Sequence, residues 1–335
     1  MHNGNSIKLL AGNSHMELAE AVAEHLGIHL VPCDLRRFSN GEIDVHIFES
    51  VRDEDVFILQ TGCTETNDHL MELFILISAC KTASARRITA VIPCYPYARQ
   101  DKKDQSRAPI TAKLVANMLA VAGCTHVITM DLHASQIQGF FEVPVDNLFS
   151  EPIMMRYIKQ EIPGWQNSII ISPDAGGAKR ATSIADKLNV DFGLINRSRD
   201  LRIKSTETEP RDTMKLLVGD VKDKIAILVD DMIDTGSTLT MAARTLNESG
   251  ASKVYALVAH GVLAEANLAN IASLPLERLV VTNTVPQSAK IKALAAADPE
   301  GKSKMVVVDV SHTIAESIRR THNGESISFL FSELP

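Results

Sequence analysis

Short apolar runs alternate with helical patterns of apolar residues along most of the chain. In the first half, runs of the kind that forms buried strands occupy residues 6–11, 30–33, 56–60, 88–93 and 126–130. The second half repeats this order, with predicted strands at residues 169–172, 192–195, 214–218, 225–229, 255–259, 279–282 and 306–310. Strands that alternate with helices are typical of parallel sheets with crossover helices. The pattern therefore predicts the α/β class, with two tandem doubly wound domains at residues 1–149 and 150–335.

The stretch from residue 226 to 239 predicts a buried strand, a tight loop and the start of a helix. Its polar and glycine positions are Asp230, Asp231, Asp234, Thr235, Gly236, Ser237 and Thr238. Backbone N–H groups at a helix start bind phosphate, whereas carboxylates suit sugar hydroxyls or a metal ion. A capped helix after a strand is the simpler interpretation, but capping does not require three carboxylates. We therefore predict a site for a ribose phosphate.

Three further polar stretches follow predicted strands, at residues 98–104, 131–136 and 173–180. In doubly wound sheets, ligands bind beyond the carboxyl ends of the strands, so these stretches are expected to face ligands. The polar stretch at residues 196–213 carries both charges and is too long for a simple spacer. This length predicts a functional loop or lid.

Composition excludes several classes of protein. The formal net charge of −7 over 335 residues argues against a general nucleic-acid binder. No apolar run reaches the ~18–20 residues that span a bilayer, and the first ten residues lack the pattern of a secretory signal. The odd number of widely spaced cysteines predicts reduced thiols in a cytoplasmic protein and does not favour a zinc site. The five cysteines are Cys33, Cys63, Cys80, Cys94 and Cys124.

Four motifs carry a resemblance to a known family. The run from Asp131 to Asp146, together with residues 97–104, 172–180 and 229–238, resembles the ribose-phosphate diphosphokinases, also called phosphoribosyl-pyrophosphate synthetases. The similarity covers residues 6–332 and is greatest to the class I, eukaryotic-type enzymes. It implies a phosphoribosyltransferase-like fold and transfer of the diphosphoryl group of ATP to the 1-hydroxyl of ribose 5-phosphate. The products would be AMP and phosphoribosyl pyrophosphate for nucleotide biosynthesis, with Mg²⁺ as cofactor.

The resemblance also implies which residues bind each group. ATP would be bound by Arg99, Gln100, Asp101, Lys102, Lys103 and Asp104, and by Phe38, Asn40 and Glu42 of a neighbouring subunit. The ribose 5-phosphate loop would be Asp230, Asp231, Asp234, Thr235, Gly236, Ser237 and Thr238. The metal candidates are Asp131, His133, Glu142, Asp146 and Asp174, and His133 would also contact the ATP phosphates.

Regulation and assembly are implied in the same way. ADP or phosphate would bind at a subunit interface of a hexamer, which contains one kind of chain or this chain with paralogous subunits. The matching positions are Ser50, Arg52, Arg107, Ser135, Gln138, Asn147, Ser311 and Thr313. Taken singly, each of these is an ordinary surface polar residue.

The lid departs from the family pattern. The family usually has His-Lys-Glu-Arg after this strand, where this chain has Asn196-Arg197-Ser198-Arg199 and a loop several residues longer. Guanidinium and ammonium groups are not interchangeable, but we expect Arg197 and Arg199 to act as electrostatic clamps in catalysis. The departure leaves a non-catalytic regulatory subunit as one alternative. Because the motif at 229–238 is shared with phosphoribosyltransferases, such an enzyme is the other.

Overall fold

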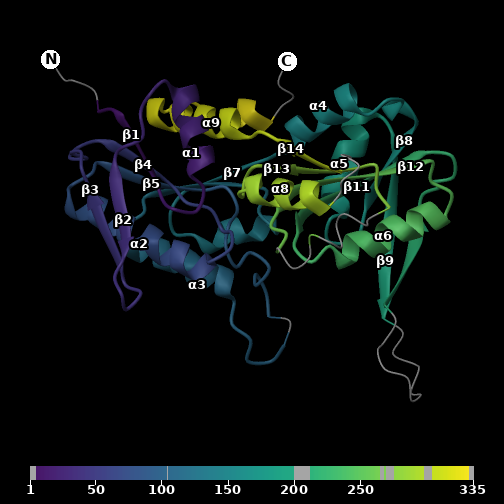
Figure 1. Cartoon of the computed structure of the whole chain (residues 1–335), viewed down its shortest axis with the longest axis horizontal. Coiled ribbons are helices and arrows are strands. Elements are labelled where there is room, and N and C mark those ends of the chain that lie inside the picture. Colours follow the sequence, from purple (N-terminus) through teal and green to yellow (C-terminus); the bar gives the residue numbers. More distant parts are fainter. Residues whose placement is uncertain are drawn as a thin grey trace. The chain divides into compact units, whose positions relative to one another are not determined.

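The computed structural model describes residues 5–103, 105–199, 212–264, 268, 275–297 and 304–331. The chain divides into two compact units (Figure 1). Unit 1 contains Met1–Pro152, Asn283–Pro286 and Asp309–Pro335, and unit 2 contains Ile153–Thr282 and Gln287–Val308. This division differs from the consecutive domains expected at 1–149 and 150–335. The C-terminal segment returns to unit 1 because helix α9 (Ser311–Asn323) packs against helix α1 (Met16–Leu26).

Unit 1 is built on a parallel sheet with the strand order β1-β4-β5-β6-β7. The strands are β1 (Ile7–Ala11), β4 (Asp55–Leu59), β5 (Arg87–Ile92), β6 (His126–Met130) and β7 (Val145–Leu148). Helices α1 and α9 lie on one side of this sheet, and α2 (Thr66–Thr82) and α3 (Thr111–Ala122) on the other (Figure 1). Because both faces are covered, every residue of β4 is buried. Short 3-10 helices lie at Ser135–Phe140 and Ser328–Phe331.

Unit 2 is built on a seven-stranded sheet with the order β10-β9-β8-β11-β12-β13-β14. The strands are β8 (Ser168–Ser172), β9 (Asp191–Arg199), β10 (Asp212–Val218), β11 (Ile225–Ile233), β12 (Lys253–Gly261), β13 (Arg278–Thr282) and β14 (Met305–Val308). Neighbouring strands are parallel except for β9 and β10, which are antiparallel. The helices are α4 (Glu151–Glu161), α5 (Ala178–Leu188), α6 (Ser237–Glu248) and α8 (Ser288–Ala297), with a 3-10 helix at Trp165–Asn167.

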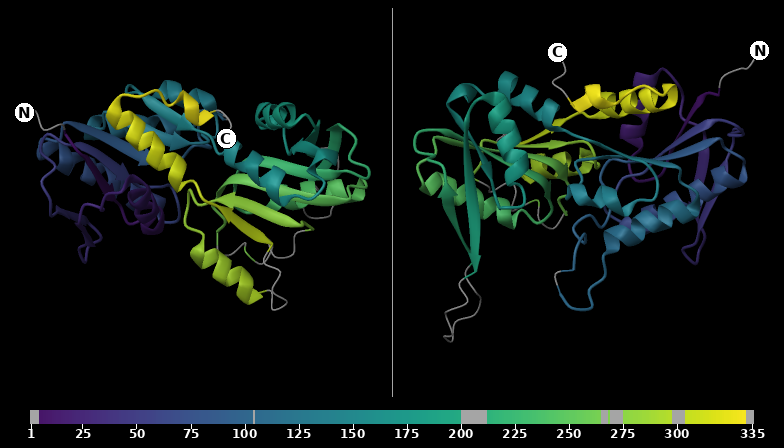
Figure 2. Two further views of the ribbon diagram at one scale, coloured as in Figure 1. Left: turned by 90° about the horizontal axis from the view of Figure 1, so that it is seen from above. Right: turned by 180° about the vertical axis from the view of Figure 1, so that it is seen from behind.

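The core of unit 2 lies on both faces of its sheet. Successive residues of β11 point to opposite faces, so Ala226 and Leu228 enter one apolar cluster and Ile227 and Val229 the other. Helices α4 and α5 cover one face, and α6 and α8 cover the other (Figure 2). One parallel and one largely parallel sheet, both with crossover helices, confirm the predicted α/β fold class.

The elements that follow helix α1 differ from the sequence prediction. Residues 30–33 were expected to form a strand, but Leu30 makes only an isolated bridge to Leu9. Instead, β2 (Cys33–Arg37) pairs with β3 (Ile43–Ile47) in an antiparallel hairpin. The prediction was wrong because neither strand has a fully buried residue, so the hairpin lacks an apolar run. Strand β7 and helices α4 and α8 also formed where no element was expected.

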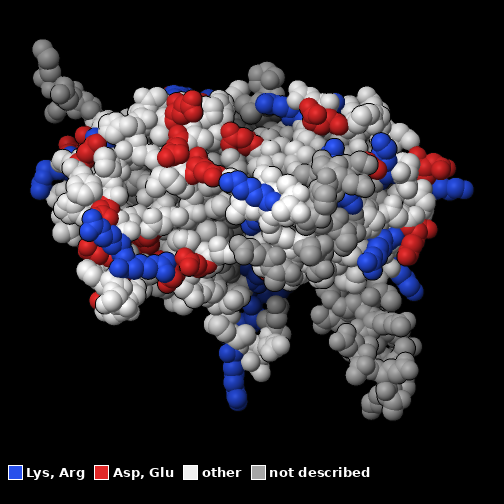
Figure 3. Space-filling view, viewed as in Figure 1, with Lys and Arg blue, Asp and Glu red and all other residues white. Residues whose placement is uncertain are grey.

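Surface charge and thiols agree with the compositional expectations. On the face shown in Figure 3, acidic and basic side chains are interspersed. None of the five cysteines, all of which lie in the described residues, forms a disulfide. Within the part of the chain that the structure describes, no helix has the length and apolarity needed to cross a membrane.

Hydrogen bonds connect the carboxyl end of α9 to the amino ends of β4 and β5. The buried Asp55 carboxylate accepts hydrogen bonds from Arg87 Nε at 2.8 Å and from His322 Nδ1 at 2.7 Å. Arg87 also donates to the carbonyl oxygens of Thr321 and His322, at 3.4 and 3.2 Å. Burial acts to raise the pKa of Asp55, but the hydrogen bonds outweigh it, so the pKa lies below its usual value. The ionised carboxylate therefore holds α9 against the sheet.

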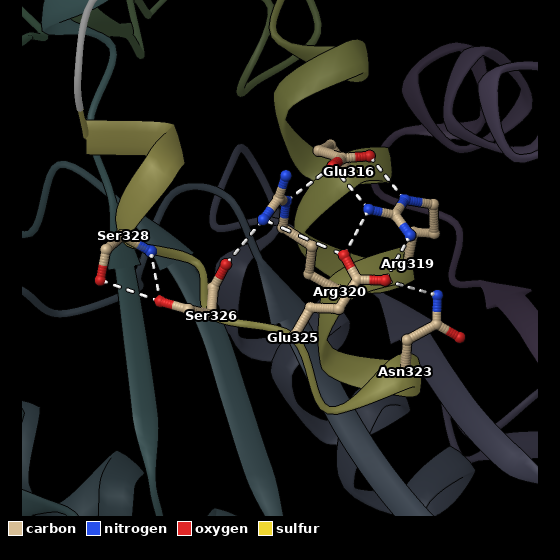
Figure 4. A network of polar contacts seen from close by, with 7 residues as sticks. All are labelled: Glu316, Arg319, Arg320, Asn323, Glu325, Ser326 and Ser328. Carbon is tan, nitrogen blue, oxygen red and sulfur yellow. Dashed lines mark hydrogen bonds and ion pairs between the residues drawn. The ribbon is translucent and has the colours of Figure 1, made fainter.

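We expect Asp55→Asn to lower the free energy of unfolding by about 2 kcal/mol, because hydrogen bonds to a charged group contribute ~1.5–3 kcal/mol. The wild type should lose the same stabilisation as the pH falls below about 4, through the depressed pKa of Asp55. Urea unfolding at pH 7 measures the loss. The matched control is Glu316→Gln in the more exposed network of Figure 4, where Glu316 accepts hydrogen bonds from Arg319 and Arg320. Equal losses in the two variants would contradict the assignment.

Candidate active site

The predicted strand–loop–helix at residues 226–239 is present in unit 2. Strand β11 continues through Asp230 and Asp231 to Ile233, and α6 begins at Ser237. Gly236 has a φ of 75°, a left-handed conformation that favours glycine, and it ends the tight loop. The buried face of α6 contains Leu239, Ala242, Ala243 and Leu246, which follow the i, i+3, i+4, i+7 spacing of a helix with one apolar face. The loop thus presents the first backbone N–H groups of a three-turn helix.

Carboxylates gather at the carboxyl ends of β8 and β11, which are neighbours in the sheet. Burial raises the pKa of Asp230 to about 8, and the nearby carboxylates of Asp231 and Asp174 act in the same direction. Asp230 Oδ1 accepts a hydrogen bond from the Asp231 backbone N–H at 2.9 Å, and Asp174 Oδ1 accepts one from Gly177 N at 2.9 Å. These carboxylates repel one another, so the cluster favours a cation or hydroxyl donors.

Hydroxyl groups lie at the loop between β11 and α6. Thr235 and Ser237 are exposed, and their hydroxyl oxygens lie 3.1 Å apart. Together with the start of α6, these hydroxyls offer donors to an anion. Asp231, in contrast, is buried, with 7% of its surface exposed. One further residue was not assigned a role from the sequence: the Arg180 guanidinium lies 3.8 Å from Asp231 Oδ1. Its place in the first turn of α5, three residues after Gly177, is the pattern that would have identified it.

The donor set suits a metal that keeps water or substrate ligands. Asp174, Asp230 and Asp231 supply only hard oxygen atoms, as magnesium-type cations require. Among the described residues, no three His, Cys, Asp or Glu side chains are arranged to enclose a metal by themselves. A cation held through one or two carboxylates plus phosphate oxygens fits this arrangement, whereas a closed structural site does not.

We expect the stability of the ligand-free protein to depend on Asp230 across neutral pH. A carboxyl whose pKa is raised on folding stabilises the protein when protonated, so this contribution is lost as the pH rises from about 4 to about 8. Asp230→Asn should unfold at a higher temperature than the wild type at pH 8 and at a similar temperature at pH 4. Midpoints of thermal unfolding between pH 4 and 8 measure the difference. Parallel curves for the two proteins would show that Asp230 titrates normally.

The nucleotide-side candidates of unit 1 come together at the carboxyl ends of β5 and β6. Arg99 and Gln100 are exposed on the loop after β5, and His133 is exposed on the loop after β6. The two loops are joined because Gln136 Nε2 donates to Asp101 Oδ2 at 3.1 Å. Lys102 and Lys103 are exposed beside them, while Asp104 lies outside the described residues.

The remaining metal candidates of unit 1 are not gathered around His133. Asp131 is buried, and its Oδ2 accepts a hydrogen bond from Ser150 N at 2.8 Å. Glu142 is exposed in the segment that leads into β7. Asp146 lies near the start of β7, with its Oδ2 2.9 Å from Nε2 of His126 at the amino end of β6. Of the metal candidates in unit 1, only Asp131 and His133 share a loop at the ligand edge.

The hairpin tip presents the aromatic residue expected to contact a base. Phe38 is 55% exposed, and the tip is closed by a hydrogen bond from Phe38 N to Glu42 O at 2.8 Å. Asn40 Oδ1 accepts a hydrogen bond from Glu42 N at 3.1 Å, which leaves the Glu42 side chain exposed. The tip is therefore ordered without covering its aromatic ring.

The proposed regulatory residues separate into two groups. Ser50 and Arg52 line a cavity of about 330 Å³, and Arg107, Ser135 and Gln138 are exposed. Asn147, Ser311 and Thr313 are buried. Two of these have internal partners: Asn147 Oδ1 accepts from Leu132 N at 3.1 Å, and Ser311 Oγ donates to Asp309 at 2.7 Å. In the isolated chain only the exposed group is accessible to an anion.

The lid begins and ends in strands. The sequence predicted a loop over residues 196–213, but Arg197 pairs with Met214 and Arg199 with Asp212 in the β9–β10 ladder. The loop is therefore shorter than expected. Residues 200–211, including Lys204, lie outside the described residues.

Comparison with known proteins identifies the family. A family model described as the N-terminal domain of ribose phosphate pyrophosphokinase matches residues 7–123, and a phosphoribosyl synthetase-associated domain matches residues 195–332. Ribose-phosphate pyrophosphokinase 2 of Schizosaccharomyces pombe is 58% identical over 332 residues, covering 99% of each chain. The crystal structure of phosphoribosylpyrophosphate synthetase from Mycobacterium smegmatis is 37% identical, with a TM-score of 0.85 over 96% of this chain and 100% of that chain. The chain therefore belongs to the ribose-phosphate pyrophosphokinase family.

Proposed function

We propose that this protein transfers the diphosphoryl group of ATP to the 1-hydroxyl of ribose 5-phosphate, which yields phosphoribosyl pyrophosphate and AMP. The observation that carries the proposal is the carboxylate cluster at the end of β11, directly before the phosphate loop that opens α6. Nucleotide binding alone would not require this cluster. Family membership adds the ATP half of the reaction.

The acceptor is held by unit 2. Asp230 and Asp231 accept hydrogen bonds from the 2- and 3-hydroxyls, and residues 235–238 bind the 5-phosphate through backbone N–H groups and hydroxyls. This orientation leaves the 1-hydroxyl free to attack. The oxygen forms a bond to the β-phosphorus of ATP, the bond between that phosphorus and the α,β-bridging oxygen breaks, and AMP leaves. The proton of the hydroxyl is released.

The donor is held by unit 1, and the protein contributes chiefly position and charge. Arg99 binds near the phosphates and Gln100 near the base, with His133 toward the phosphates. Mg²⁺ is the divalent cation that fits oxygen donors; the Asp131–His133 loop would hold it in unit 1, and Asp174 is the candidate in unit 2. When bound, it neutralises charge on the diphosphoryl group. Arg197 and Arg199 of the lid supply further positive charge.

We also propose that Phe38, Asn40 and Glu42 complete the adenine site of a neighbouring subunit in a hexamer, regulated by ADP or phosphate. The exposed aromatic ring at an ordered hairpin tip supports this role, because aromatic rings stack on bases. Phe38→Ala should raise the KM for ATP about tenfold, given a stacking contribution of ~1–3 kcal/mol. Initial rates together with the mass in solution measure it. A monomeric variant with full turnover would refute the shared site.

One assay distinguishes the proposal from its alternatives. Purified protein is incubated with ATP, ribose 5-phosphate and Mg²⁺, and AMP is quantified. AMP formation supports the diphosphokinase. Binding of both substrates without AMP formation supports a regulatory subunit. The observation that favours this alternative is Arg197, which stands where the family usually has lysine. Activity only with phosphoribosyl pyrophosphate and a base supports a phosphoribosyltransferase.

A further inference from the structure

Thr61 joins several loops at the carboxyl edge of the sheet of unit 1. It follows β4 and is 1% exposed. Its backbone N–H donates to Ser14 Oγ at 2.8 Å, and its hydroxyl accepts from Cys94 N at 3.0 Å and donates to Thr284 O at 2.6 Å. The hydroxyl of Thr61 therefore links its own loop after β4 to the loop after β5 and to the segment Asn283–Pro286, and its backbone N–H adds the loop after β1.

The contact with Cys94 fixes the start of the nucleotide-side loop. Cys94 follows β5, and Arg99 and Gln100 come five and six residues later. Its carbonyl oxygen accepts a hydrogen bond from Gly62 N at 2.8 Å, so residues 61–62 hold both backbone polar groups of Cys94. The approach is close, because a Cβ atom on Gly62 would lie 2.8 Å from that oxygen. The position of this loop thus depends on the end of β4.

A buried polar network fixes the partners of Thr61. The Gln60 side chain accepts from Ser14 N at 3.0 Å and donates to Glu72 Oε1 at 2.8 Å. Glu72 is 4% exposed, and it also accepts from Asn13 N at 2.7 Å. Buried networks whose members are hydrogen-bonded are rigid, so Ser14 cannot move to compensate for a change at Thr61.

We infer that Thr61 is a positioning residue for the nucleotide side of the active site, acting through Cys94 on Arg99 and Gln100. Removing the hydroxyl would leave the Cys94 N–H and the Thr284 carbonyl buried without this partner, which the loop would relieve by moving. Displacement of about 1 Å can reduce a reaction rate ~100-fold when positioning dominates catalysis. This inference rests on the proposed function, and it assigns a role outside the ligand-contacting residues.

The test compares Thr61→Val with the conservative Thr61→Ser. We expect Thr61→Val to raise the KM for ATP about tenfold, because two buried backbone groups lose their hydrogen bonds to the hydroxyl. The KM for ribose 5-phosphate should change less than about twofold, because that site belongs to unit 2. Thr61→Ser keeps the hydroxyl and should retain nearly the wild-type KM. The matched control is Thr125→Val, whose hydroxyl donates to Ile88 O and accepts from Ile88 N, both at 3.0 Å, at the amino edge of the same sheet.

Three results would overturn the inference: equal increases in both KM values, an ATP effect no larger than that of Thr125→Val, or no recovery in Thr61→Ser. If Thr61→Val does not fold, Gly62→Ala perturbs the same contact by crowding Cys94 O and should show the same selectivity for ATP. Calorimetric titration with ATP gives the comparison without turnover. If the wild type binds ATP but forms no AMP, the proposed function is refuted. The effect of Thr61 on ATP binding can then still be measured by calorimetry.

Discussion

The Asp231→Asn variant is expected to lose about 10- to 150-fold in kcat/KM for ribose 5-phosphate. Asp231 is buried near the carboxyl end of β11, and in the proposed site its carboxylate accepts hydrogen bonds from the sugar hydroxyls. A hydrogen bond to a charged group contributes ~1.5–3 kcal/mol, and each 1.36 kcal/mol corresponds to a factor of about ten. An amide keeps the shape but loses the charge and one acceptor atom. Titration of ribose 5-phosphate at saturating ATP measures the loss.

A second acid-to-amide change in unit 2 controls for indirect effects. Asp220 is exposed in the turn between β10 and β11, where its carboxylate accepts a hydrogen bond from Lys222 N at 3.0 Å. Asp220→Asn should leave the affinity for ribose 5-phosphate and the turnover unchanged. If Asp231→Asn behaved in the same way, Asp231 would have no part in the acceptor site.

Replacing Arg197 by alanine is expected to reduce kcat by about 100- to 1000-fold, the effect of removing one preorganised group that stabilises charge in the transition state. The backbone of Arg197 is held by pairing with Met214 in the β9–β10 ladder, so the residue enters the lid from a fixed strand. Binding of ribose 5-phosphate should be little affected, because its loop belongs to β11 and α6. Single-turnover rates at saturating substrates isolate the chemical step.

Two further variants make this result specific. Lys215→Ala removes an exposed positive charge from the neighbouring strand, where Lys215 pairs with Asn196, and should retain turnover. Arg197→Lys introduces the residue usual in the family and should restore most of the rate. A nearly normal rate in Arg197→Ala would remove Arg197 from catalysis.

The order of elements was predictable where strands are apolar on both faces. Strand β4 lies within a residue of its predicted bounds at 56–60, because its apolar residues form a continuous run. The β2–β3 hairpin was missed since its residues are at most half-buried. The return of α9 to unit 1 was not predictable either, because it depends on contacts between distant residues. One of these contacts joins His322 to Asp55, which are 267 positions apart in the chain.

The candidate site was predictable to the extent that chemistry follows local sequence. Residues 230–238 form the predicted strand end, loop and helix start, because glycine and carboxylates mark that turn directly. Contacts between distant segments were not predictable. The sequence alone does not show that Asn147 is buried against Leu132, or that Thr61 joins Cys94 to Thr284. The proximity of Arg180 to Asp231 likewise requires the pairing of β8 with β11.

In the proposed reaction, the sugar hydroxyl attacks the β-phosphorus of ATP. This step is tested with ATP labelled at the β-phosphorus, ribose 5-phosphate and Mg²⁺, by following the label into the separated products. We expect all transferred label to appear in phosphoribosyl pyrophosphate, with one unlabelled AMP formed for each. Labelled ADP as the product, or no conversion by a protein that binds both substrates, would contradict it.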